Sequence, residues 1–158
     1  MGKAIKLKNN LYIDKSSIHF EDSNSVNMNG YKGYWCRITS HVFTVQYTRF
    51  CGRVLIENGG YQPAMADIWF SYYAQNALSS SSPFVSQTKI LNATGYFSLS
   101  NQVAITVEGK GTNSVIVSLW VYEPYDYSIL NIFKMYNTFD IKNCVKAKTL
   151  PGEITYLT

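Results

Sequence analysis

Residues 114–123 read SVIVSLWVYE, and this stretch decides the fold class. Apolar side chains fill every second position, which is the pattern of a β-strand that turns one face to a core; they are Val115, Val117, Leu119 and Val121. Residues 103–107 alternate in the same way, with Val103, Ile105 and Val107 on one face. The EGKGTN stretch at 108–113 supplies glycines for a turn, so the two segments are predicted to form a β-hairpin.

The same alternation predicts strands along the rest of the chain. In 66–73 the predicted inward set is Ala66, Ile68, Phe70 and Tyr72, and in 42–48 it is Phe43, Val45 and Tyr47. Further strands are predicted at 4–8, 34–39, 53–57, 88–91, 127–136, 140–145 and 153–157. Turn residues separate them, and no segment shows a clean helical period. The sequence therefore predicts an all-β fold, an antiparallel β-sandwich or jelly roll of about ten strands.

The length of 158 residues suits a single domain. The first thirty residues mix short alternating pieces with a polar stretch, so we expect an N-terminal connector arm at 1–32 and a β-sandwich head at 33–158. Residues 1–3 fit a flexible expression leader equally well. No signal peptide is recognised, and no apolar run reaches the ~20 residues that span a bilayer, so membrane insertion is not expected.

The composition favours a binding protein. The chain has 13 Tyr, 8 Phe and 3 Trp, more large rings than a core of this size normally holds. A net charge of +4 comes from scattered Lys and Arg, which weakly favours an anionic partner and does not indicate nucleic-acid binding. Three cysteines, an odd number without a Cys-x-x-Cys spacing, are expected to be reduced and packed.

Several large side chains fall on the faces opposite the predicted inward sets. Trp69 and Tyr73 share such a face with Asp67, and these three residues are candidate ligand contacts. Trp35, Trp120 and Tyr122 are candidate oligomer contacts. Two interpretations are open at each position: the second face packs on another part of the fold, or it meets a ligand or a second protomer.

The run YEPYDY at 122–127 is the most distinctive short stretch. Pro124 cannot donate to a strand ladder, so it ends or bends the strand and gathers Glu123, Tyr125, Asp126 and Tyr127 at a corner. Aromatic rings and carboxylates are the groups that hold sugars, which makes these four candidate ligand contacts. The alternative is a structural corner whose tyrosine hydroxyls satisfy loop backbone groups.

Signs of catalysis are weak. The two histidines, His19 and His41, lie in no metal-ligand spacing, and Gly109-Lys110-Gly111-Thr112 sits between strands, so it is assigned to a hairpin and not to a phosphate loop. Paired carboxylates from Asp67, Glu123 and Asp126 could in principle hydrolyse a glycoside. Ten acidic residues produce such pairs by chance, so we predict no enzyme activity, no catalytic residue, no cofactor and no metal site.

Three stretches carry a family resemblance: 33–60 (GYWCRITSHVFTVQYTRFCGRVLIENGG), 65–74 (MADIWFSYYA) and 114–136 (SVIVSLWVYEPYDYSILNIFKMY). Together they resemble the C-terminal head domains of bacteriophage tail-fibre and baseplate receptor-binding proteins. Such heads share a Gly-Tyr-aromatic start, a hydrophobic strand ending near WVYEPYDY and a Pro-Gly near the chain end, in this order. The preceding LKNNLYIDKSSIHF is similar to the connectors that lead into them.

The resemblance implies a homotrimeric head that recognises a cell-surface polysaccharide, teichoic acid or protein on a bacterial host. It also implies a virion protein at the tail-fibre or baseplate tip, made in the host cytoplasm. Two alternatives use the same sequence features. One is a monomeric carbohydrate-binding module of a secreted or cell-surface protein, and the other is a structural virion or adhesin domain without a ligand.

Overall fold

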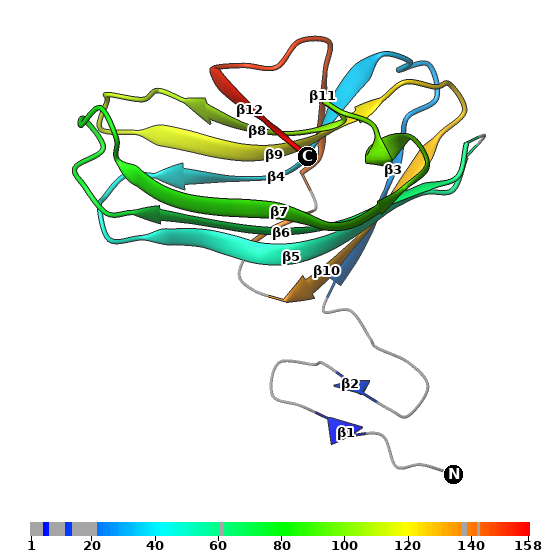
Figure 1. The fold of residues 1–158 in the computed structure, drawn as a ribbon, viewed down its shortest axis with the longest axis horizontal. Helices are drawn as coiled ribbons and strands as arrows, with labels where there is room; N and C mark the ends of the chain where they lie inside the picture. Colours follow the sequence, from blue (N-terminus) through cyan, green and yellow to red (C-terminus); the bar gives the residue numbers. More distant parts are fainter. Residues whose placement is uncertain (1–4, 7–11, 14–21, 61, 137–138, 142) are drawn as a thin grey trace.

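Two antiparallel five-stranded sheets stack face to face in a computed structural model that describes residues 5–6, 12–13, 22–60, 62–136, 139–141 and 143–158 (Figure 1). The first sheet has the order β3 (Asp22–Asn27), β10 (Ile129–Tyr136), β5 (Arg49–Asn58), β6 (Ala64–Ala74) and β7 (Phe84–Thr94). The second has the order β11 (Val145–Ala147), β4 (Tyr34–Phe43), β9 (Val115–Glu123), β8 (Val103–Glu108) and β12 (Glu153–Leu157). The predicted all-β sandwich of about ten strands is confirmed.

Two smaller elements complete the described chain. The short strands β1 (Ile5–Lys6) and β2 (Tyr12–Ile13) pair with each other. A single turn of 3-10 helix, η1 (Gly95–Ser98), connects β7 to β8 and buries Tyr96 and Phe97. Most of the strand predicted at 4–8 and most of the predicted connector lie outside the described residues.

The core lies between the two sheets and follows the predicted alternation. Every second residue of β6 is buried, and the inward set Ala66, Ile68, Phe70 and Tyr72 is confirmed. On the opposite sheet Val115, Val117, Leu119 and Val121 are fully buried. The predicted hairpin is also present, because β8 pairs with β9 around a turn in which Gly109 and Gly111 have positive φ.

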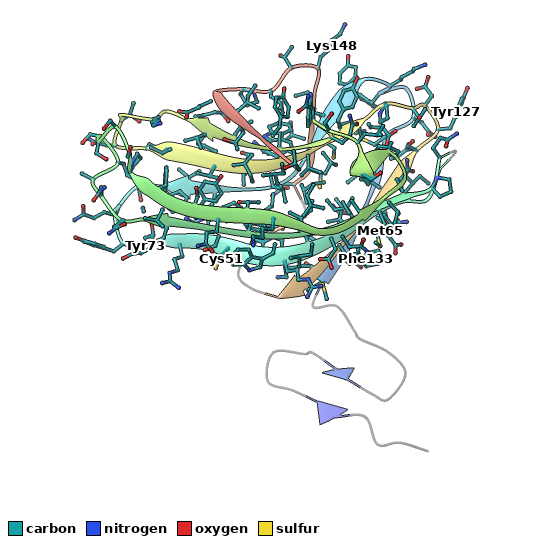
Figure 2. All side chains as sticks on the ribbon, in the orientation of Figure 1. Cys51, Met65, Tyr73, Tyr127, Phe133 and Lys148 are labelled. Carbon is teal, nitrogen blue, oxygen red and sulfur yellow. The ribbon has the colours of Figure 1, made fainter. Side chains whose placement is uncertain are left out.

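A second apolar cluster lies on the outer side of the second sheet. It is formed by Trp35, Ala104 and Trp120, with Tyr122 and Leu150 packed against it. The segment between β11 and β12 brings Leu150 to this cluster, and Figure 2 places Lys148 of the same segment above the sheet. The chain therefore covers part of this outer face itself.

Two predicted strands are wrong. The strand predicted at 42–48 ends at Phe43, and the residues after it form a turn in which Tyr47 has a φ of 63°. Val45 and Tyr47 are exposed instead of inward, because an apolar alternation over a turn mimics a strand. The strand predicted at 140–145 is also absent from the described residues of that range except at Val145, where β11 begins. Ile141 is nevertheless buried.

The sandwich begins earlier than residue 33, where the sequence placed the start of the head. β3 lies inside the predicted arm and pairs with β10 along six residues. The sequence of β3, DSNSVN, lacks a recognisable strand pattern, because β3 is an edge strand and its outward positions are polar. Val26 and the following Met28 provide its buried contacts, so residues 22–28, expected in the arm, belong to the sandwich.

Candidate functional site

The outer face of the first sheet carries an orderly set of large and charged side chains. Along β6 the outward residues are Met65, Asp67, Trp69, Ser71 and Tyr73, all partly buried. Figure 2 shows Met65, Tyr73, Cys51 and Phe133 on the side of this sheet that faces away from the second sheet. We call the part formed by Arg49, Arg53, Asp67, Trp69, Tyr73 and Lys89 the outer platform.

Strand register sets the spacing within the outer platform. Trp69 pairs with Arg53 on β5 and with Lys89 on β7, so a cation flanks the indole on each side. Tyr73 follows four residues later, at a strand rise of roughly 3.3 Å per residue, which separates the Cα atoms of the two residues by about 13 Å. The outward residue between them is Ser71, which has a small side chain.

An ion pair fixes one end of the outer platform. The Nε and Nη2 of Arg53 donate hydrogen bonds to the two carboxylate oxygens of Asp67 at 2.9 and 2.6 Å. This two-point contact holds both side chains in one orientation, next to Trp69. Asp67, predicted as a ligand contact, is thus already engaged by Arg53 in the structure.

The other end of the outer platform combines a ring with a cation. The guanidinium carbon of Arg49 lies 5.2 Å from the centre of the Tyr73 ring, within the range of a cation–π contact. Arg49 and Lys89 are both exposed. The rings Trp69 and Tyr73 therefore lie in a locally positive environment, which suits an anionic or polar ligand with apolar faces.

The predicted corner at 122–127 is organised around a buried carboxylate. Glu123 is fully buried, and its Oε2 accepts hydrogen bonds from the Tyr96 hydroxyl at 2.8 Å and from the Asn58 amide at 3.3 Å. Its Oε1 accepts a bond from the Tyr125 backbone N–H at 2.9 Å. The Asn58 amide also lies 3.3 Å from the Ser128 hydroxyl. Glu123 therefore joins the corner to Asn58 and Tyr96 and is not placed to contact a surface ligand.

Burial governs the titration of this polar cluster. It raises the pKa of Glu123 above its ordinary value, while bonds from the Tyr125 backbone and the Tyr96 and Ser128 side chains act in the opposite direction. Burial also raises the pKa of Tyr96, and the neighbouring Glu123 adds to the effect. A buried, multiply bonded carboxylate of this kind has a structural role, as in the alternative interpretation of the corner.

The other corner residues are placed differently from one another. Tyr125 packs against the core and meets the Tyr96 ring edge-on at 5.6 Å, and Asp126 is partly buried. Tyr127 is 77% exposed with a φ of 60°. Figure 2 shows Tyr127 and Tyr73 at opposite ends of the sandwich. The predicted ligand contacts thus fall into two groups, the outer platform and the corner.

The three predicted oligomer contacts form one group within the chain. Trp35 and Trp120 are 8% and 2% exposed, and the rings of Trp35 and Tyr122 lie 5.2 Å apart. The indole N–H of Trp120 donates to the Thr106 hydroxyl at 2.8 Å. Both tryptophans therefore pack within their own chain, as the first interpretation of the outer faces expected. The outer face of the second sheet packs against the chain's own 147–150 segment.

The described residues contain no group of three or more His, Cys, Asp or Glu side chains that could hold a metal ion. Of the carboxylates considered for glycoside hydrolysis, Asp67 is paired with Arg53 and Glu123 is buried at the corner. The structure does not bring these two together. What the outer platform offers is a contact surface of rings, cations and hydrogen-bonding groups.

Comparison with protein-family models, curated proteins and solved structures finds no match for the chain. Within the described residues, no helix has the length and apolar character needed to cross a membrane. The resemblance to phage receptor-binding heads therefore stays a prediction.

Several residues of these sites were not predicted from the sequence. Arg49 and Arg53 come from β5 and reach the outer platform through strand register, which the sequence does not specify. Asn58, Tyr96 and Ser128 reach Glu123 from distant segments. Of these residues, only Arg53 could have been found from the sequence. It begins the strand predicted at 53–57, and the alternation along β5 puts its side chain on the outer face.

Proposed function

We propose that this chain is a non-enzymatic receptor-binding domain that recognises a bacterial cell-surface glycan or protein, as part of a phage tail fibre. The observation that carries the binding role is the outer platform, where Trp69 and Tyr73 lie on a partly exposed sheet face between Arg49, Arg53 and Lys89. Rings on a rigid sheet provide contact area at low entropic cost, and the cations favour polysaccharides that carry negative charge, including teichoic acids.

The experiment is a binding measurement on intact bacteria and on purified surface glycans. Trp69→Ala and Tyr73→Ala should each weaken binding at least tenfold, in line with the loss of a ring at the centre of an interface. Tyr127→Asn is the matched control, because Tyr127 is an exposed ring at the opposite end of the sandwich from Tyr73 (Figure 2) and Asn tolerates its positive φ. Equal binding by the platform variants and the control would refute the assignment of the site.

The monomeric carbohydrate-binding module is the second candidate, and one observation favours it. Two of the three residues predicted to face another protomer, Trp35 and Trp120, are covered within the chain. Light scattering coupled to size exclusion separates the candidates. A trimer at micromolar concentration supports the tail-fibre proposal, whereas a 17.9 kDa monomer that binds glycans supports the module. A trimer gains avidity on a repeating surface, which a monomer does not.

A further inference from the structure

Two of the three cysteines meet at the edge of the second sheet. Cys36 lies on β4, where its register partner on β11 is Lys146, and Arg37 pairs with Val145. Cys144 directly precedes β11, so it stands diagonally across from Cys36 on the same side of the sheet. Cys36 is fully buried and Cys144 is partly exposed.

Both side chains pack against the core between the sheets, and the Cys144 sulfur lies 3.9 Å from the backbone oxygen of Ile38, two residues along β4 from Cys36. The Cys144 sulfur also accepts a bond from the Asn24 side-chain amide at 3.5 Å, and as a thiol it donates to the backbone oxygen of Ile141 at 3.2 Å. These contacts hold Cys144 beside Cys36 from β3 on one side and from the 139–144 segment on the other.

The surroundings give the two sulfurs different reactivities. The pKa of Cys144 is lowered, first by the hydrogen bond from Cys36 and then by Asn24 and Arg37, whereas burial and Asp140 oppose the shift. The pKa of Cys36 is raised, first by its bond to Cys144 and then by burial, and Lys146 opposes this. The partly exposed sulfur is thus the one favoured as a thiolate, and the thiolate is the nucleophile.

We propose that Cys36 and Cys144 are a thiol–disulfide pair, which closes to an intramolecular disulfide on reaction with a small oxidised disulfide such as glutathione disulfide. The free thiols of the structure are the reduced state of this pair. Cys51 takes no part, because it lies on β5 in the first sheet with its side chain on that sheet's outer side (Figure 2).

The reaction has two exchange steps. The Cys144 thiolate attacks one sulfur of glutathione disulfide, which breaks the S–S bond, forms a mixed disulfide on Cys144 and releases one glutathione thiolate. That thiolate takes up a proton from solvent. Cys36 then loses its proton to solvent and attacks the Cys144 sulfur, which releases the second glutathione. Two protein thiols are oxidised to one disulfide, and one glutathione disulfide is reduced to two thiols.

The fold allows the small approach that bond formation requires. Diagonal neighbours on paired strands are further apart than the Cβ separation of a disulfide, about 3.5–4.5 Å. Cys144 lies at the end of a three-residue edge strand and not within a ladder, so its segment can shift towards β4 without breaking the central strand pairs. The bond would fasten the 139–147 segment to the sandwich.

The test uses the full chain, incubated under native conditions with glutathione disulfide and then analysed by mass spectrometry. The expected product has lost about 2 Da, for two hydrogens, and a proteolytic map joins the peptides of Cys36 and Cys144. Because the closed loop is long, Tm should rise by about 5–15 °C. Added dithiothreitol should reverse both changes.

Variants assign the roles of the cysteines. Cys51→Ser should behave as the unaltered chain does, and Cys144→Ser should form no disulfide. Cys36→Ala should stop after the first step and retain a glutathione adduct on Cys144. The proposal is overturned if the unaltered chain, still folded by circular dichroism, gives only glutathione adducts or a cross-link that includes Cys51. This readout on the unaltered chain holds even where a substitution at the buried Cys36 prevents folding.

Discussion

Replacement of Trp120 by alanine tests whether the second apolar cluster is part of the protomer's own core. Trp120 is 2% exposed, and its removal leaves a cavity beneath Leu150 and beside Trp35. Loss of a buried Trp costs about 3–5 kcal/mol, and the buried Thr106 hydroxyl also loses the indole donor, for about 1 kcal/mol more. Against a total stability of roughly 5–15 kcal/mol, this is a large loss.

Urea unfolding followed by far-ultraviolet circular dichroism measures the effect without relying on Trp fluorescence. Trp120→Ala should lower the free energy of unfolding by about 4–6 kcal/mol and Tm by about 8–20 °C. Trp120→Phe keeps most of the ring and should cost only about 1–3 kcal/mol, because chiefly the hydrogen bond is lost. Combined with Thr106→Val, it should cost less than the two single changes together, since both remove the same bond.

Trp69→Ala is the matched control. Trp69 is a tryptophan on an outer sheet face that is only partly buried, so its loss should cost about 1 kcal/mol or less. Similar losses for Trp120→Ala and Trp69→Ala would refute the reasoning. So would a loss at Trp120 that depends on protein concentration, because that dependence identifies a contact between chains and not within one.

Three further changes test the polar contacts. The raised pKa of Glu123 means that its contribution to stability is full below the unfolded pKa of about 4.3 and is lost as pH rises through the folded value; Glu123→Gln should remove that slope in urea titrations. Burial lowers the pKa of His41, so stability should instead fall as pH drops from about 6.5, and His41→Gln should flatten this part of the curve. Asp67→Asn should lower the free energy of unfolding by about 1 kcal/mol or less, because Arg53 is one-third exposed. The same change should weaken glycan binding through the loss of Arg53 and Trp69 orientation, as a binding titration would show.

The sequence predicted the strands whose inward positions are all apolar, and it predicted them best where the strand is central. In β6 and β9 a side chain on the wrong face would put a polar group in the core, so the alternation is strict. The edge strand β3 lacks that constraint on its outer side, and its serines and asparagines conceal it. The turn at 44–48 fails for the opposite reason, since an exposed Val45 and Tyr47 reproduce a strand pattern without a core.

From the sequence, the candidate site could be predicted only as a set of residues on one face of a single strand. Asp67, Trp69 and Tyr73 were placed on one outward face because a strand repeats every two residues, and the structure places them so. The register between strands decides which residues of β5 and β7 lie beside them, namely Arg53, Arg49 and Lys89. The burial of Glu123 depends on segments 27 to 65 residues away, which no local pattern reports.

The aromatic residues on the outer faces of the two sheets differ in what covers them. On the second sheet the chain's own 147–150 segment covers Trp35 and Trp120, so these rings are part of a core and do not call for an outside partner. On the first sheet no described strand stacks on the outer side; there Arg49 lies over the Tyr73 ring, and Trp69 has Arg53 and Lys89 as its register partners. The partial exposure of these two rings beside Arg49 and Lys89 is what supports the proposed binding role.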